Sequence, residues 1–177
     1  ILPIAITPLL TRLYTPEDFG MYGFVLALIL ILSIFGTAKF EHAIFIVKKK
    51  YTADLVLKFT LLNAVLFSFV LSIIITLFSK EISLVNSNVS PLAWSLIPLG
   101  VVIISSYVAL RAWLNKQARY DVMRSNLIAQ SVTYSSLQIL FSFSEAFRII
   151  GLILGDILGK GMTTILILKR VDFRRTR

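Results

Sequence analysis

The sequence has no cysteine and a single histidine, His42, among its 177 residues. Without cysteine the chain cannot form a disulfide bond, and it offers no thiol nucleophile. It also has no residue cluster with metal-ligand spacing, no nucleophile elbow and no glycine-rich loop of the kind that holds phosphate. We therefore expect that the protein is not an enzyme and that it uses no metal and no cofactor.

Charged residues are scarce as well. They make up 15% of the chain, whereas 57% of the residues are hydrophobic and the mean hydropathy is +0.86. Soluble helices need a polar face, and a membrane-spanning helix needs about 20 apolar residues. The composition therefore indicates a membrane protein rather than a soluble bundle. The long stretches with little or no charge are Met21–Ala38, Phe59–Ser79, Leu92–Leu110, Ser125–Ser144 and Ile149–Leu168.

These stretches predict an all-α fold, a polytopic membrane helical bundle of about six transmembrane helices. The expected spans are residues 1–13, 20–42, 57–79, 92–112, 124–144 and 147–168. The first has about 13 residues, or roughly 20 Å of helix, which is too short to cross a bilayer. Because the chain also begins without methionine, we expect that its first helix is truncated at the amino terminus.

Basic residues outnumber acidic residues by 18 to 9, and they gather after the second, fourth and sixth spans. Cytoplasmic loops of membrane proteins are enriched in lysine and arginine, so these regions are predicted to face the cytoplasm. We expect them to contact anionic lipid head groups and not nucleic acid. The three basic clusters are Lys48, Lys49, Lys50 and Lys58; Arg111, Lys116, Arg119 and Arg124; and Lys169, Arg170, Arg174, Arg175 and Arg177.

A first polar group, Lys39, Glu41 and His42, lies near the cytoplasmic end of the span at 20–42. The apolar run continues beyond it to Val47, which favours a position a turn or two inside the membrane boundary. Lys39 and His42 share a helix face at a spacing of three residues. Two interpretations are open: a cationic entrance for an anionic head group, or ordinary snorkelling of long side chains to the membrane surface.

A second polar group, Asp156 and Lys160, interrupts the last span, and its four-residue spacing allows an ion pair on one helix face. Ionisable residues inside a membrane are costly, which makes them candidates for a functional site. Gly151, Gly155 and Gly159 repeat every four residues on a different face, a pattern typical of close helix packing. The pair is expected either to face a cavity and contact substrate or to lock this helix to a neighbour.

The span at 124–144 is rich in serine, asparagine and glutamine, which lie along two stripes. So many polar side chains are not expected to face lipid. We expect one stripe to hydrogen-bond across helices and the other to line a wet cavity. The stripes are Ser131, Ser135, Gln138 and Ser142, and Asn126, Gln130 and Thr133.

A short loop precedes the span at 20–42, and each of its residues suits a local role. Arg12 ends an apolar run and can reach the membrane surface, where the ring of Tyr14 is also expected to lie. Thr15 is a suitable helix cap, Pro16 suits the first helical position, and the acids that follow favour the positive end of the helix dipole. Gly20 is predicted to let the new helix pack closely against a neighbour.

This loop, with its run Pro16-Glu17-Asp18-Phe19-Gly20-Met21-Tyr22, resembles the first external loop of the polysaccharide-transport flippases. The glycine-rich run Gly151–Gly159 is similar to the sixth helix of that family, and the resemblance covers nearly the whole chain. The family belongs to the superfamily of multidrug, oligosaccharidyl-lipid and polysaccharide exporters. The resemblance implies about twelve to fourteen helices in two lobes, of which this chain is the amino-terminal one.

The resemblance also implies a transporter that moves a polyprenyl-pyrophosphate-linked oligosaccharide across the bacterial cytoplasmic membrane by alternating access, for O-antigen, capsule or teichoic-type polysaccharide. The implied partners are this lipid-linked substrate, membrane lipids and other polysaccharide-assembly proteins. The candidate substrate-binding residues are Lys39, Glu41, His42, Asp156 and Lys160. Two alternatives stay open. One is a cation-coupled drug antiporter, in whose cavity acidic residues should outnumber basic ones. The other is a membrane scaffold that transports nothing.

Overall fold

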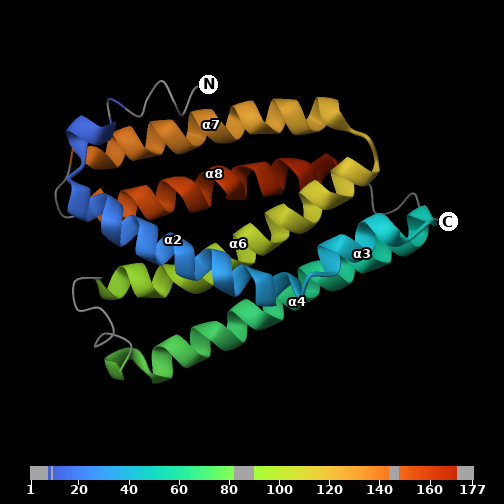
Figure 1. Cartoon of the computed structure of the whole chain (residues 1–177), viewed down its shortest axis with the longest axis horizontal. Coiled ribbons are helices and arrows are strands. Elements are labelled where there is room, and N and C mark those ends of the chain that lie inside the picture. Colours follow the sequence, from blue (N-terminus) through green and yellow to red (C-terminus); the bar gives the residue numbers. More distant parts are fainter. Residues whose placement is uncertain (1–7, 9, 82–89, 144–147, 171–177) are drawn as a thin grey trace.

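The computed structural model describes residues 8, 10–81, 90–143 and 148–170, which form helices and no strand (Figure 1). The all-α fold is therefore confirmed over this part of the chain. The predicted first span, 1–13, lies largely outside the described residues. The helices are α2 (Pro16–Thr37), α3 (Phe40–Ile46), α4 (Lys50–Leu77), α6 (Pro91–Lys116), α7 (Tyr120–Ser142) and α8 (Arg148–Arg170).

Four of the described helices, α2, α4, α6 and α8, are long and apolar enough to cross a membrane. The chain is therefore a polytopic membrane protein. α7 has 23 residues, which is sufficient length, but it is not among the four because its serine, asparagine and glutamine side chains lower its hydropathy. An uncharged stretch is not necessarily an apolar one, and the polar stripes noted in the sequence at 124–144 account for the lower hydropathy.

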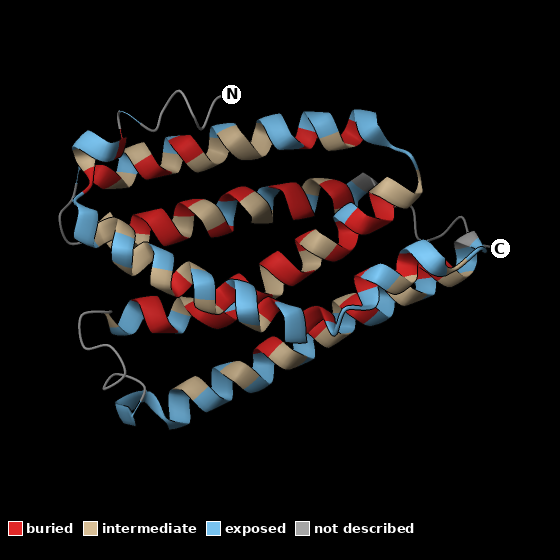
Figure 2. Ribbon diagram, viewed as in Figure 1, coloured by how far each residue is buried: buried red, intermediate tan, exposed pale blue. Residues whose placement is uncertain are grey.

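α6 is the central helix of the bundle. It contacts α2, α3, α4, α7 and α8, and it crosses between the α7–α8 pair and α4 (Figure 1). Its buried Ile97 and Val101 belong to one apolar cluster with Val25 and Ile29 of α2. Figure 2 shows that α6 and α8 are largely buried, whereas α4 turns most of its surface outward. Because the exposed large side chains of α4 are apolar, this surface suits contact with lipid tails.

The predicted span 20–42 is wrong at its end, because the helix breaks at residues 38 and 39. Both Ala38 (φ 46°) and Lys39 (φ 59°) adopt the left-handed conformation, so α2 stops at Thr37 and α3 begins at Phe40. The 22 residues of α2 measure about 33 Å, which already crosses a bilayer. The break therefore lies at the edge of the membrane, and the two residues that form it, Ala38 and Lys39, are neither glycine nor proline.

Asn63 of α4 stabilises this break from the side. Its Nδ2 donates to the carbonyl oxygens of Gly36 at 2.8 Å and Phe35 at 3.4 Å, near the end of α2. The Phe35 oxygen also accepts from the Ala38 N–H at 3.1 Å, but carbonyl groups at a helix end generally lack a partner in the helix and are costly to leave unpaired away from water. Asn63 thus holds the end of α2 against α4.

We expect Asn63→Leu to lower the stability of the protein by about 1–2 kcal/mol, because the substitution removes this donor while nearly keeping its volume. Thermal unfolding in detergent should show the loss as a lower midpoint. Thr76→Val is the matched control on α4, since the Thr76 hydroxyl donates only to Ser72 of its own helix. Equal midpoints for the two variants would show that Asn63 does not support the break.

Candidate functional site

Three of the four glycines of α8, Gly151, Gly155 and Gly159, pack against α7, and this contact fixes which face of α8 points toward α7. A Cβ atom at Gly151 would lie 2.2 Å from Phe141 Cβ, and one at Gly155 would lie 2.9 Å from Gln138 Cγ. At Gly159 the nearest atom is Tyr134 Cβ, at 3.2 Å. The two helices therefore approach closely only because these positions lack a side chain.

With the glycines turned to α7, Asp156 and Lys160 lie on a neighbouring face of α8. Lys160 Nζ is 2.6 Å from Asp156 Oδ2, and the two side chains are 18% and 12% exposed. They follow the start of α8 at Arg148 by about 12 Å and 18 Å along the helix. The ion pair therefore lies near the middle of the membrane, partly open to the surroundings.

The acidic end of this pair borders a tight hollow between α2 and α8 that has no room for a water molecule. It is lined by apolar side chains of both helices together with Tyr22 and Asp156. Tyr22 interacts electrostatically with Asp156 and with Tyr134 of α7, so three helices contribute polar groups here. The full lining consists of Tyr22, Leu26, Ile29, Ile153, Asp156 and Ile157.

The chemistry of this site is that of a shielded cation. A lone charge at membrane depth costs several kcal/mol, and the partner carboxylate offsets much of that cost. The Lys160 side chain keeps 18% exposure, and an ammonium group is a good partner for phosphate oxygens as well as for a carboxylate. The arrangement can bind an anion reversibly without breaking a covalent bond.

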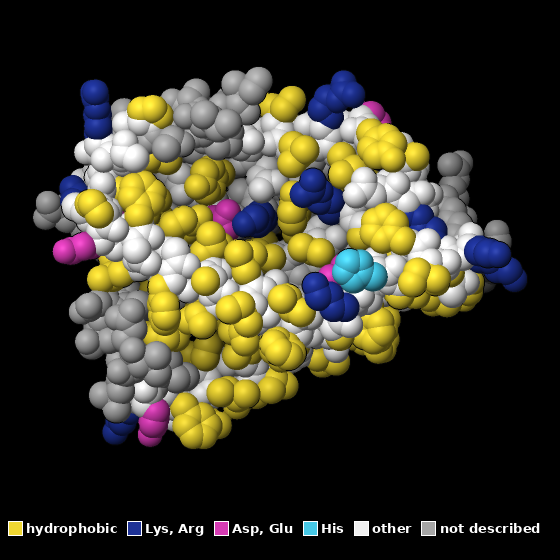
Figure 3. Space-filling model, viewed as in Figure 1, with side chains coloured by type: hydrophobic (Ala, Val, Ile, Leu, Met, Phe, Trp, Pro, Cys, Tyr) yellow, Lys and Arg dark blue, Asp and Glu magenta, His cyan; other side chains and the backbone are white. Residues whose placement is uncertain are grey.

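The first polar group lies elsewhere, at the break between α2 and α3. Lys39 and His42 are exposed, whereas Glu41 turns inward and is 8% exposed. Because α2 alone crosses the bilayer, these residues lie at the membrane edge and not within an unbroken span. Figure 3 shows the single histidine and several basic side chains on one face, with hydrophobic side chains between them.

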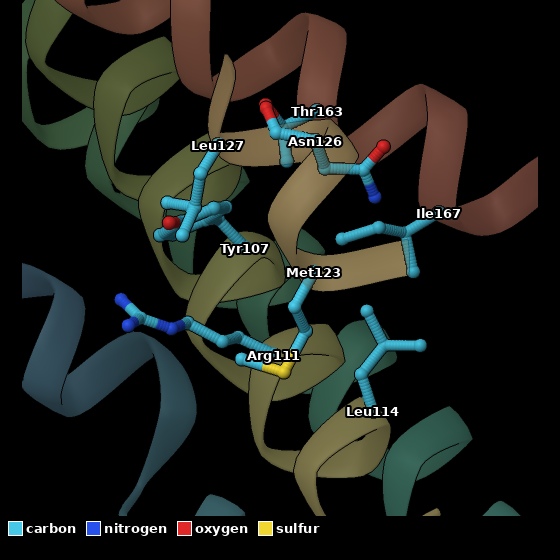
Figure 4. A pocket seen from close by; sticks show the side chains of 8 residues that line it. All are labelled: Tyr107, Arg111, Leu114, Met123, Asn126, Leu127, Thr163 and Ile167. Carbon is cyan, nitrogen blue, oxygen red and sulfur yellow. The ribbon is translucent and has the colours of Figure 1, made fainter. Parts of the chain in front are cut away.

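Arg111 is a further cation that the sequence interpretation treated only as a topology signal. It lies on α6 at the edge of a small pocket that α7 and α8 complete (Figure 4). Its stem follows the pocket wall, and its guanidinium extends away from the other lining side chains. Arg111 comes five residues before α6 ends at Lys116, and nothing in the sequence distinguished it from the other basic residues nearby. The lining residues are Tyr107, Arg111, Leu114, Met123, Asn126, Leu127, Thr163 and Ile167.

The polar stripes of α7 are partly buried against α8. Asn126, Ser135, Gln138 and Ser142 are each at most 4% exposed. The side-chain amide of Gln138 has no hydrogen-bond partner among the described residues, and neither has Asn126 Nδ2. Cross-helix hydrogen bonding by the Gln138 side chain is therefore absent from this part of the structure. The helix packs instead through the glycine contacts.

The loop before α2 contains a capping box. Thr15 Oγ1 accepts from the Asp18 N–H at 3.2 Å, Asp18 Oδ2 accepts from the Thr15 N–H at 2.9 Å, and Pro16 occupies the first turn. Arg12 is exposed. Tyr14, whose ring was predicted to lie at the membrane surface, is buried among the helices, and its hydroxyl donates to the Gln138 carbonyl at 2.5 Å.

The pKa of Tyr14 and the packing at Gly20 complete the description of this region. Burial, with the nearby Asp18, raises the pKa of Tyr14 to about 12, so its hydroxyl stays a neutral donor at physiological pH. The close packing predicted for Gly20 is wrong within the described chain. A Cβ atom there would meet nothing within 4 Å, because Gly20 lies on the exposed side of α2.

Comparison with known proteins agrees with this architecture. A family model described as "Polysaccharide biosynthesis protein" matches residues 9–176, which is almost the entire chain. No curated protein matches the chain significantly, and no solved structure does. On the strength of the family match, together with the four apolar helices, the chain belongs to a family of polysaccharide biosynthesis proteins and is a membrane member of it.

Proposed function

We propose that the chain forms one lobe of a flippase in the bacterial cytoplasmic membrane. Its substrate would be an oligosaccharide repeat unit linked to a polyprenyl pyrophosphate, moved from the cytoplasmic to the external leaflet for polysaccharide assembly at the surface. The observation that carries the proposal is the Asp156–Lys160 pair, a reachable cation in the middle of an otherwise apolar bundle. No covalent step and no cofactor is needed.

The substrate has three parts, and the bundle suits each of them differently. The pyrophosphate is anionic and would exchange with Asp156 at the Lys160 ammonium group. The polyprenyl tail is apolar and would stay in the bilayer, beside surfaces such as the outer face of α4. The sugar would cross in a cavity between this lobe and a second one, in an alternating-access cycle.

The charge balance favours an anionic substrate over the drug antiporter. Asp156 is the one acid within the described membrane-spanning part of α8, and its carboxylate is already paired with Lys160. Arg111 adds a second cation on α6, away from the acid. A site for a cationic drug would need acids in excess of bases.

Disrupting the gene for the full-length protein tests this function. We expect the lipid-linked repeat unit to accumulate in the cytoplasmic leaflet while its synthesis continues, and surface polysaccharide to disappear. Restoring the wild-type gene should reverse both effects. If the repeat unit reaches the external leaflet normally without the protein, the transport function is wrong; if the repeat unit is not made, the protein acts in synthesis instead.

The orientation in the membrane can be tested with single cysteines, because the chain has none of its own. We expect Glu17→Cys, in the first turn of α2, to react with an impermeant thiol reagent added outside intact cells. Lys49→Cys should react only after the cells are opened, because the lysine-rich end faces the cytoplasm. Both positions are exposed, so accessibility does not distinguish them. Labelling of position 49 from outside would invert the topology.

We expect Lys39→Ala/His42→Ala to reduce export by about tenfold if these side chains admit the anionic head group, which corresponds to one lost charge-assisted contact. Surface polysaccharide and protein level should be measured together. Thr52→Ala is a control near the same membrane edge, on α4. Unchanged export in the double variant would leave Lys39 and His42 as surface residues that merely reach water.

A further inference from the structure

α3 and the first turns of α4 carry a surface that the transport function does not use. α3 follows α2 directly after the break, so it begins where α2 has already crossed the bilayer. The start of α4 runs beside α3 and contacts it (Figure 1). The two helices together therefore extend to the membrane edge on the lysine-rich side.

Large apolar side chains are exposed on this surface. Phe45 is 51% exposed and Ile46 is 79% exposed, and Tyr51 and Leu55 of α4 are also exposed. Leaving this area in water would cost about 25 cal/mol for each Å² of apolar surface. The surface is therefore suited to the interfacial layer of a bilayer, where amphipathic helices bury their apolar face.

On this surface the basic side chains are exposed, whereas the acidic side chains are buried. Lys48 and Lys49 are exposed between the two helices. The two acids of the region turn inward: Glu41 is 8% exposed and Asp54 is 7% exposed. Asp54 Oδ1 accepts a hydrogen bond from Trp113 Nε1 at 2.7 Å, which keeps this carboxylate away from the surface. What remains outside is apolar and cationic.

Hydrogen bonds from α6 fix the orientation of α3. Lys116 Nζ donates to the carbonyl oxygen of Ile44 at 2.5 Å and to that of Val47, at the end of α3. A cation at this position also interacts favourably with the negative end of the helix dipole. Because Lys116 is held there, Phe45 and Ile46 cannot turn inward without breaking these contacts.

We infer that α3 and the start of α4 form a binding surface for anionic phospholipids in the leaflet on the lysine-rich side. Anionic head groups match Lys48 and Lys49, and the acyl region next to them matches Phe45 and Ile46. A neutral lipid would satisfy the apolar part alone. The combination selects a phosphate-bearing lipid with net negative charge.

A fluorophore on Ile46→Cys tests this inference in reconstituted vesicles. We compare quenching by brominated phosphatidylglycerol with quenching by brominated phosphatidylcholine, each at the same fraction of the lipid. We expect phosphatidylglycerol to quench more strongly, and the preference to fall about fivefold for each lysine removed in Lys48→Gln/Lys49→Gln. High salt should weaken the preference. Arg119→Gln/Lys169→Gln is the control, because it removes the same charge from another part of the lysine-rich side and should preserve the preference.

Three results with the labelled protein would overturn the inference. Equal quenching by both lipids would show contact with lipid but no selection of charge. Quenching by aqueous iodide and by neither lipid would place the surface in water, where a soluble acidic protein is the better partner. Displacement of phosphatidylglycerol by stoichiometric undecaprenyl diphosphate would assign the surface to the transported lipid.

Discussion

The variant Asp156→Asn/Lys160→Met is expected to accumulate to the wild-type level and to lose nearly all export. The double substitution removes both charges, so no unpaired charge is left at membrane depth. It keeps the shape of both side chains approximately. The Lys160 ammonium group is absent, however, and in our account the pyrophosphate then has no cation with which to pair. Protein level and surface polysaccharide should therefore separate in this variant.

The two single variants measure the cost of leaving one charge of the pair unpaired in the membrane. Lys160→Met leaves Asp156 alone, and Asp156→Asn leaves Lys160 alone, at a side-chain exposure below 20% in the wild type. We expect each to lower the protein level, because an unpaired charge in the membrane costs several kcal/mol. A double variant more stable than either single variant would demonstrate the coupling.

A charge swap separates position from pairing. Asp156→Lys/Lys160→Asp keeps the pair but moves the cation by about 6 Å, one turn of helix. We expect a normal protein level and reduced export. Full export by both the swapped and the neutral double variants would show that the pair has no contact with substrate, and α8 would then be a packing element only.

Gly151→Ala is expected to be the most damaging small substitution in the chain. The added Cβ would lie 2.2 Å from Phe141 Cβ, an atom that is fixed to the backbone and cannot rotate away. α7 and α8 must then separate, at a cost of about 1–3 kcal/mol or more for overpacking. The protein level and the midpoint of thermal unfolding in detergent should both fall.

Two other glycines are matched controls for this effect. At Gly23 of α2 a Cβ would meet nothing within 4 Å, and at Gly161 of α8 the nearest atom is 3.5 Å away, an ordinary contact. Gly23→Ala should stabilise its helix by up to about 1 kcal/mol, since alanine is the better helix former. If Gly151→Ala is as stable as these controls, the α7–α8 contact is looser than the structure shows.

The sequence was most informative where local chemistry decides the structure. Stretches with little charge predicted the places of α2, α4, α6, α7 and α8, because membrane helices carry few charges, but the predicted ends differ from the observed ones by up to seven residues. The Thr15–Pro16 start of α2 was readable because capping involves only neighbouring residues. The four-residue spacing of Asp156 and Lys160 likewise gave the ion pair that the structure contains.

Features that depend on contacts between helices could not be read in the same way. The break after Thr37 uses Ala38 and Lys39, which do not mark a helix end, and it is supported by Asn63 from another helix. Tyrosine is typical of the membrane surface, but Tyr14 is buried, and its hydroxyl donates to the Gln138 carbonyl of another helix. Arg111 could not be told from the other basic residues until α7 and α8 placed a pocket beside it.

Movement of a lipid-linked oligosaccharide in vesicles tests the central claim most directly. The full-length protein would be reconstituted with a substrate that carries a fluorophore on its sugar, and an impermeant reductant would bleach the outer leaflet. Our account predicts that wild-type protein exposes the inner-leaflet substrate as well, whereas Asp156→Asn/Lys160→Met leaves it protected. Protected substrate with the wild-type protein, or equal exposure with both proteins, would contradict the account.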